Sequence, residues 1–186
     1  MGNRIDASTL TRHQALAAFA GLIVAGLLAF AVGMRLVPAA QLALLASLMA
    51  TIAVTDYFTF RVPDWLVIVT GVSGLGFALT AGDLSTIVET TFRMIVIGLV
   101  VLGLREIYFR WRGFDGLGLG DIKLLVAAGA WIDWNGIAHA VLIAAVAALA
   151  VAGLIASFRG WDRMRRLPFA SFLAPSIVAA WLMSPW

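Results

Sequence analysis

Long apolar segments follow one another along almost the whole chain, and they limit most strongly what it can fold into. Seven such runs alternate with short polar or charged segments, at residues 15–34, 38–55, 65–80, 85–104, 121–134, 136–158 and 169–186. About 20 apolar residues are long enough to cross a bilayer as an α-helix. A helix also satisfies every backbone polar group inside lipid. The runs therefore predict an all-α, polytopic membrane bundle of about seven transmembrane helices.

The overall composition agrees with a single membrane-embedded domain. Hydrophobic residues make up 62% of the 186 residues, whereas soluble domains contain about 45 to 50%. We therefore expect one domain over residues 1–186, with residues 1–13 as a polar cytoplasmic tail. The first apolar run is longer than the core of a usual signal peptide and further spans follow it, so we expect it to be retained as a helix.

The positions of Lys and Arg indicate how the helices are oriented. With the amino terminus in the cytoplasm, all but two of the 13 basic residues fall in cytoplasmic segments, as the positive-inside rule requires. The exceptions are Arg35 on the outer side and Arg93 within the fourth run. This distribution explains the formal net charge of +3. We accordingly expect the lipid bilayer as a partner and no nucleic acid.

Two acidic residues stand where apolar runs meet the predicted cytoplasmic surface. Asp56 follows the second run, and Asp121 opens the fifth run directly after three alternating glycines. A carboxylate at such a place is costly unless it is used or paired. Lys123 is a poor local partner for Asp121, because residues two apart on a helix point in different directions. Two carboxyls at one partly desolvated site divide into an ionised and a protonated member, which supplies a general base and a general acid.

Few other side chains suit catalysis or metal binding. The chain has no cysteine, and its two histidines are His13 and His139. This excludes a disulfide and a cysteine zinc site, and it leaves too few ligands for a catalytic zinc. A Ser-His-Asp triad is disfavoured as well, since no histidine adjoins a loop serine. We expect neither a metal nor another cofactor.

The two acidic residues lie in motifs that resemble the signatures of the type IV prepilin leader peptidases. In that family an aspartate is followed seven positions later by a proline and then usually by an asparagine, and here these positions hold Asp56, Pro63 and Asp64. The family's glycine-x-glycine-aspartate motif and its following lysine correspond to residues 118–123. Residues 167–174 are similar to the family's proline-phenylalanine segment at the start of the last helix.

The resemblance implies an intramembrane-type aspartic endopeptidase of the bacterial inner membrane. Such an enzyme removes the short basic leader of prepilins or pseudopilins on the cytoplasmic side, for type IV pilus assembly or protein secretion. Asp56 and Asp121 would be the catalytic pair. The residues that would support the site or bind substrate are Gly118, Gly120, Lys123, Pro63 and Asp64.

This chain resembles the short, peptidase-only members of tight-adherence pilus systems. Larger members carry a cytoplasmic insert with two cysteine pairs, which this sequence lacks. Methylation of the new amino terminus stays open at this point, as do the oligomeric state and the particular prepilin.

Two alternatives from other classes remain open from the residues alone. A proton-coupled transporter would use the same two aspartates together with glycine-interrupted helices. Against it, the two halves of the chain show no inverted repeat, and the acids lie at helix ends rather than near the middle of the membrane. The other alternative is a purely structural partner within a pilus machine.

Three further side chains have open or structural roles. Lys123 would either stabilise the negative charge of the aspartate pair or extend to lipid headgroups. Glu89 and Arg93 are four residues apart in the fourth run and are expected to form an ion pair that lowers the cost of immersion.

Overall fold

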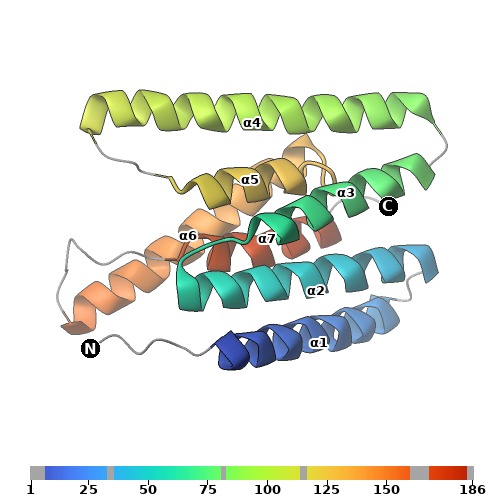
Figure 1. Cartoon of the computed structure of the whole chain (residues 1–186), viewed down its shortest axis with the longest axis horizontal. Helices are drawn as coiled ribbons and strands as arrows, with labels where there is room; N and C mark the ends of the chain where they lie inside the picture. The colour runs from blue at the N-terminus through green and yellow to red at the C-terminus, as the bar shows by residue number, and fades with distance from the viewer. Residues whose placement is uncertain (1–6, 33–35, 81–82, 114–116, 160–167, 184–186) are drawn as a thin grey trace.

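The computed structural model describes residues 7–32, 36–80, 83–113, 117–159 and 168–183. Over these residues the chain forms seven α-helices and no strand (Figure 1). Their bounds are α1 (Ala7–Val32), α2 (Leu36–Thr59), α3 (Asp64–Thr80), α4 (Leu84–Arg112), α5 (Leu119–Ala128), α6 (Trp134–Arg159) and α7 (Ala170–Met183). The expected all-α class and the expected number of helices are confirmed.

Four of the helices, α1, α2, α4 and α6, are long and apolar enough to cross a membrane, as judged by length and composition. Helices α3 and α7 are shorter apolar helices of 17 and 14 residues. These features make the protein a multi-pass membrane protein, and they place Asp56 at the end of one candidate span.

The fifth apolar run is shorter as a helix than the sequence suggested. Helix α5 has only 10 residues, so it is about 15 Å long, half the thickness of the hydrocarbon core. It ends because the chain turns at Gly129 and continues into α6, whose first turn is capped by Asp133 through a bond from the Gly136 amide at 2.7 Å. Asp121 therefore lies outside the four candidate spans.

Successive helices run in alternating directions. The amino ends of α1, α3, α5 and α7 and the carboxyl ends of α2, α4 and α6 lie toward the same end of the bundle, on the left in Figure 1. In the part of the chain that the structure describes, that end carries the basic residues Arg12, Arg61, Arg105, Arg110, Arg112, Lys123 and Arg159. The arrangement agrees with the expectation that this end is cytoplasmic.

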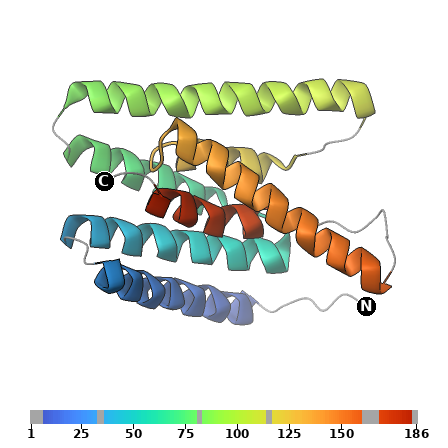
Figure 2. The same ribbon diagram turned by 180° about the vertical axis from the view of Figure 1, so that it is seen from behind.

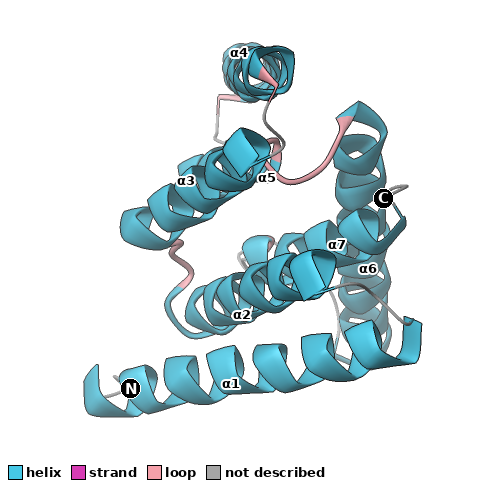
Figure 3. Ribbon diagram, turned by 90° about the vertical axis from the view of Figure 1, so that its right-hand side faces the viewer, coloured by secondary structure: helices cyan, strands magenta, loops and turns pink. Residues whose placement is uncertain are grey.

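The helices pack in two groups (Figure 3). Helices α1, α2, α6 and α7 form one group, in which α6 crosses α7 obliquely (Figure 2), and α3, α4 and α5 form the other. Glycines permit the close contacts within each group. A Cβ at Gly21 of α1 would lie 2.7 Å from the Ala46 carbonyl oxygen of α2, and one at Gly74 of α3 would lie 2.6 Å from the Ala130 Cβ. The site described next lies between the two groups.

Candidate active site

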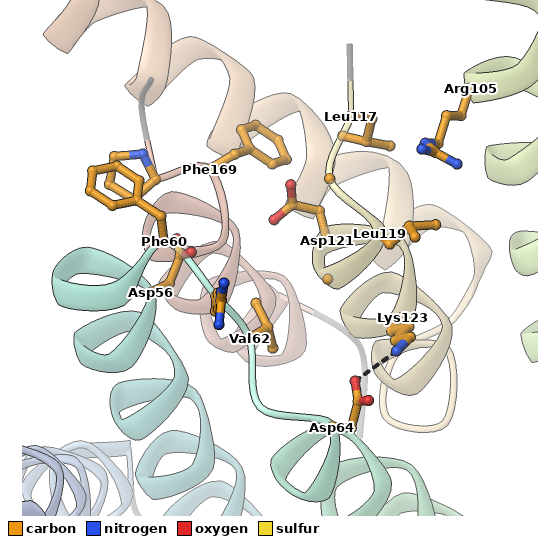
Figure 4. A pocket seen from close by; sticks show the side chains of 14 residues that line it. Asp56, Phe60, Val62, Asp64, Arg105, Leu117, Leu119, Asp121, Lys123 and Phe169 are labelled. Carbon is orange, nitrogen blue, oxygen red and sulfur yellow. Dashed lines mark hydrogen bonds and ion pairs between the residues drawn. The ribbon is translucent and has the colours of Figure 1, made fainter. Parts of the chain in front are cut away.

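A cavity of about 840 Å³ opens between the two groups at the predicted cytoplasmic end. Its walls come from the end of α2, the loop into α3, the start of α5, one residue of α4 and the segment before α7 (Figure 4). Six of the seven residues predicted for the site line it, namely Asp56, Asp64, Gly118, Gly120, Asp121 and Lys123. Pro63 is not a lining residue, and its carbonyl oxygen instead accepts the Leu66 amide at 3.1 Å in the first turn of α3.

Asp56 is held by the start of α7. Its side chain belongs to α2 and is buried, with the residue 5% exposed. The Oδ2 atom accepts a hydrogen bond from the backbone amide of Ser171 at 2.9 Å and another from the Ser171 hydroxyl at 3.1 Å. The first amides of a helix have no partner within the helix and attract negative charge. Asp56 therefore caps α7 from a different helix.

Ser171 is a site residue that sequence reasoning missed. It stands 115 positions from Asp56 in the chain, so no helical spacing connects the two. Its hydroxyl also bonds the carbonyl oxygen of Ala53 at 2.9 Å, one turn before Asp56. A partial signal was present, because Ser171 lies within the proline-phenylalanine segment at 167–174.

Asp121 faces the cavity from the first turn of α5 and is half-buried. The Gly118 amide donates a hydrogen bond to its carboxyl, so the third helical residue reaches back to the capping residue. A Cβ at Gly118 would lie 3.0 Å from the Asp121 Oδ2 atom, and the glycine thus leaves room for the carboxyl. Burial in the cavity and the nearby charge of Asp56 raise the pKa of Asp121 to about 6.

The chain leaves α2 through a left-handed residue beside Asp56. Phe60 has a φ of 53°, which is unusual for a residue with a side chain. Its amide donates to the Asp56 carbonyl oxygen at 2.8 Å. Phe60, Val62 and Phe169 line the cavity, so its acidic groups stand next to apolar and aromatic walls (Figure 4).

Two contacts hold α5 against the loop between α2 and α3 and against the first residue of α3. A Cβ at Gly120 would lie 3.1 Å from both Cβ and Cγ2 of Val62, so the absence of a side chain allows this approach. Farther along α5, the Lys123 Nζ atom bonds the Asp64 Oδ1 atom at 2.7 Å (Figure 4). Both side chains are largely exposed, and such pairs contribute about 0 to 1 kcal/mol. The sequence had suggested two roles for Lys123, and neither included Asp64.

The other end of α5 is attached to α4. The predicted ion pair between Glu89 and Arg93 is confirmed, with the Arg93 Nη1 and Glu89 Oε1 atoms 3.3 Å apart. The Arg93 Nε atom also donates to the Gly129 carbonyl oxygen at 2.8 Å. This second bond satisfies a carbonyl at the end of α5, which has no partner in its own helix.

The type IV leader peptidase family matches residues 43–153 of this chain, a stretch that includes both aspartate motifs. The prepilin leader peptidase/N-methyltransferase of Aeromonas hydrophila is 31% identical over 168 residues, which are 88% of this chain and 56% of that protein. The protein of the same name from Pectobacterium carotovorum subsp. carotovorum is 31% identical over 144 residues, 76% of this chain and 50% of that protein. One from Burkholderia pseudomallei (strain 1026b) is 55% identical over 64 residues, 34% of this chain and 20% of that protein.

The chain spans about half the length of the first two of these relatives and a fifth of the third. No solved structure matches it. The family match nevertheless covers more than half of the chain and contains the two acids that share the cavity. The chain therefore belongs to the type IV leader peptidase family.

Proposed function

We propose that this protein is an aspartic endopeptidase that removes the basic leader of prepilins or pseudopilins at the cytoplasmic face of the bacterial inner membrane. Type IV pilus assembly or protein secretion would use the product. The observation that carries the proposal is the meeting of Asp56 from α2 and Asp121 from α5 in one cavity, with the pKa of Asp121 raised by burial and by the charge of Asp56. Unequal carboxyls of this kind are what acid and base catalysis by a pair requires.

The reaction would proceed in two steps, formation of a gem-diol and cleavage of the C–N bond, with two proton transfers in each step. The ionised carboxyl takes a proton from water as the water oxygen bonds to the scissile carbonyl carbon, while the protonated carboxyl gives its proton to the carbonyl oxygen. A neutral gem-diol results. The first carboxyl then passes its proton to the amide nitrogen, and the second takes a proton from one diol hydroxyl as the C–N bond breaks. The pair returns to its starting protonation state.

The position and the walls of the cavity suit this class of substrate. A prepilin leader is basic and ends at a glycine before a hydrophobic helix. Phe60, Val62 and Phe169 offer apolar surface to the start of a helix, whereas the acidic residues of the cavity are balanced by Arg61, Arg105 and Lys123. Because the part of the substrate that follows the leader is a hydrophobic helix, it would enter laterally from the bilayer.

Substitution of the two aspartates tests the proposal. Asp56→Asn and Asp121→Asn should each lower cleavage of a prepilin peptide, consisting of leader, glycine and apolar helix, by at least about a hundredfold. The double variant should be scarcely worse than either single variant, because the two groups act as one unit. Asp133→Asn is the matched control, since Asp133 caps α6 outside the cavity. Cleavage would be measured by mass spectrometry on lipid-reconstituted protein.

Full cleavage by a folded Asp121→Asn variant would contradict the proposal. Proton-coupled flux across the reconstituted membrane, without cleavage of any prepilin peptide, would instead support the transporter alternative.

A further inference from the structure

The two carboxyls of the cavity receive different hydrogen-bond donors. Asp56 accepts the amide and the hydroxyl of Ser171 on one oxygen, at 2.9 and 3.1 Å. The Ala170 amide, at the first residue of α7, also donates to this carboxyl. Asp56 is buried, and burial acts against its ionisation. The hydrogen bonds oppose this effect, because hydrogen bonds to the charged form of a carboxyl favour that form. The amino end of a 14-residue helix acts in the same direction.

The surroundings of Asp121 favour its neutral form. It receives a backbone donor from Gly118, whereas burial and the charge of Asp56 act against its ionisation and raise the pKa of Asp121. A carboxylate at Asp56 and a carboxylic acid at Asp121 therefore form the state of the pair that best fits the described contacts.

The Ser171 hydroxyl fits both protonation states of Asp56. It has one proton and two oxygen atoms within reach, the Ala53 carbonyl at 2.9 Å and the Asp56 Oδ2 atom at 3.1 Å. The ionised carboxyl is the stronger acceptor of the two. After Asp56 has taken a proton, the hydroxyl can donate to Ala53 and accept from the carboxylic acid instead. Asp56 thus keeps a hydrogen-bonded neighbour throughout the reaction.

We propose that Ser171 is a positioning residue that keeps Asp56 as the ionised member of the pair, so that Asp56 is the general base and Asp121 the general acid of the first step. This assignment rests on the proposed peptidase function. It adds which of the two aspartates is the base and which is the acid. Ser171 acts through Asp56 and does not itself exchange a proton with substrate.

Other charged groups near Asp56 are left in place by a change at Ser171. The segment 170–183 of α7 has no titratable side chain, and on the neighbouring α1 the ring of His13 stacks on Phe58. The charged residues that share the cavity with Asp56 are Arg61, Asp64, Arg105, Asp121 and Lys123. Because a Ser171→Ala change leaves all of them unaltered, a changed pH dependence reports on the lost hydroxyl.

The test compares pH profiles of cleavage for Ser171→Ala, Ser171→Thr and the wild-type protein, with the same prepilin peptide. Loss of the hydroxyl should move the acidic limb of the profile upward by on the order of one pH unit, since hydrogen bonds to charged groups are worth about that much. The alkaline limb, which depends on Asp121, should stay in place. Ser171→Thr should restore the wild-type profile.

Ser176→Ala is the matched control. Ser176 lies on the same helix, is buried, and donates its hydroxyl to the Phe172 carbonyl oxygen at 2.8 Å. Removing it deletes a similar bond to a backbone carbonyl without touching a carboxyl, so the acidic limb should not move.

An unchanged acidic limb in folded Ser171→Ala protein would overturn the assignment while leaving the peptidase proposal intact, provided that Asp121→Asn is inactive. Movement of the alkaline limb alone would reverse the two roles and would overturn it as well. A measurement without substrate keeps the two proposals separate. Infrared spectra recorded during a pH titration should show a carboxyl band that is absent in Asp56→Asn, and this band should change at higher pH in Ser171→Ala. A band that changes at the wild-type pH would overturn the assignment even if no peptide is cleaved.

Discussion

The carboxyl of Asp121 lies where its charge is disfavoured, and this affects stability as well as chemistry. Burial and the neighbouring Asp56 raise the pKa of Asp121 from 3.8 to about 6 in the folded protein. Between these two pH values the folded state binds more protons than the unfolded state. The free energy of unfolding therefore falls as pH rises through this window, and the loss is complete above about pH 6.

Asp121→Asn should accordingly give an inactive but more stable protein. At pH 7 we expect its free energy of unfolding to exceed that of the wild type by on the order of 1 to 2 kcal/mol, after allowance for the partial exposure of the carboxyl. At pH 4 the difference should disappear, because the wild-type carboxyl is then neutral too. Thermal unfolding in detergent at both pH values measures the effect.

Asp83→Ala serves as a control, because it should change the free energy of unfolding at pH 7 in the opposite direction. Hydrogen bonds from the Ser85 hydroxyl and amide lower the pKa of Asp83, which caps α4. Its removal should destabilise the protein at pH 7 and matter less as the pH falls below the usual range of a carboxyl. A wild-type stability curve that rises between pH 4 and 6 relative to Asp121→Asn would contradict the account of Asp121.

At the scale of elements, α5 is a short helix that its neighbours hold at both ends. In its first turns, Gly120 lies close to Val62 and Lys123 forms an ion pair with Asp64. After its last turn, the Gly129 carbonyl oxygen accepts a hydrogen bond from Arg93. Ten residues bury too little surface to fix a helix alone, and isolated helices of this length are marginal. The location of Asp121 therefore depends on the loop between α2 and α3.

Gly120→Ala tests this dependence. The added Cβ would lie 3.1 Å from Val62, so either α5 or the loop must shift by a few tenths of an ångström. Misplacement of a catalytic group by about 1 Å costs roughly a hundredfold in rate, and we expect about a tenfold loss in kcat here. The second change Val62→Gly should restore much of the rate, because it removes both side-chain atoms, Cβ and Cγ2, that the new Cβ meets.

Gly76→Ala provides the matched control for a glycine within a helix. A Cβ at Gly76 in α3 would meet no atom within 4 Å, so this variant should keep full activity. Equal losses in Gly120→Ala with and without Val62→Gly would show that the contact with the loop does not position Asp121.

The helices formed by the apolar runs could be predicted from the sequence. The continuation of a helix beyond its apolar run could not. The run at 65–80 became α3 almost unchanged, because hydropathy and the proline before it define both ends. Helix α4 continues eight residues beyond the predicted end at Leu104, to Arg112. There the ion pair of Glu106 and Arg110, at 2.9 Å, and the left-handed cap at Gly113 sustain a helix outside the apolar run.

The candidate site also contains residues that the sequence predicted and contacts that it could not predict. Asp56 and Asp121 stood out in the sequence because carboxyls are rare beside apolar runs, and each lies in a recognisable motif. The contacts of Ser171 with Asp56 and of Lys123 with Asp64 join residues 115 and 59 positions apart. Local spacing carries no information on such pairs, which form only when the two helix groups come together.

At the scale of the whole molecule, the cavity and the basic residues lie at the same end. The alternating helix directions bring the loop at 60–63, the start of α5 and the segment before α7 together there (Figure 1). By the positive-inside rule, the positive charge predicts that this end faces the cytoplasm. The expected cytoplasmic location of the two aspartates is therefore tied to the orientation of the whole chain, and one experiment on orientation tests both.

Single cysteines can test that orientation, since the chain has no cysteine of its own. Trp111, at the end of α4, is 85% exposed, and Leu36, at the start of α2, is 89% exposed at the opposite end. Trp111→Cys should react with a membrane-impermeant maleimide in inside-out vesicles and not in intact spheroplasts, and Leu36→Cys should show the reverse. Asn135→Cys, exposed in the first turn of α6, should behave like Leu36→Cys, which guards against a local effect at α2. Each variant would first be shown to cleave the prepilin peptide, so that labelling refers to folded protein. Labelling of Trp111→Cys in intact spheroplasts would place the Asp56 and Asp121 cavity on the outer side, and a peptidase that acts on leaders in the cytoplasm could not have that orientation.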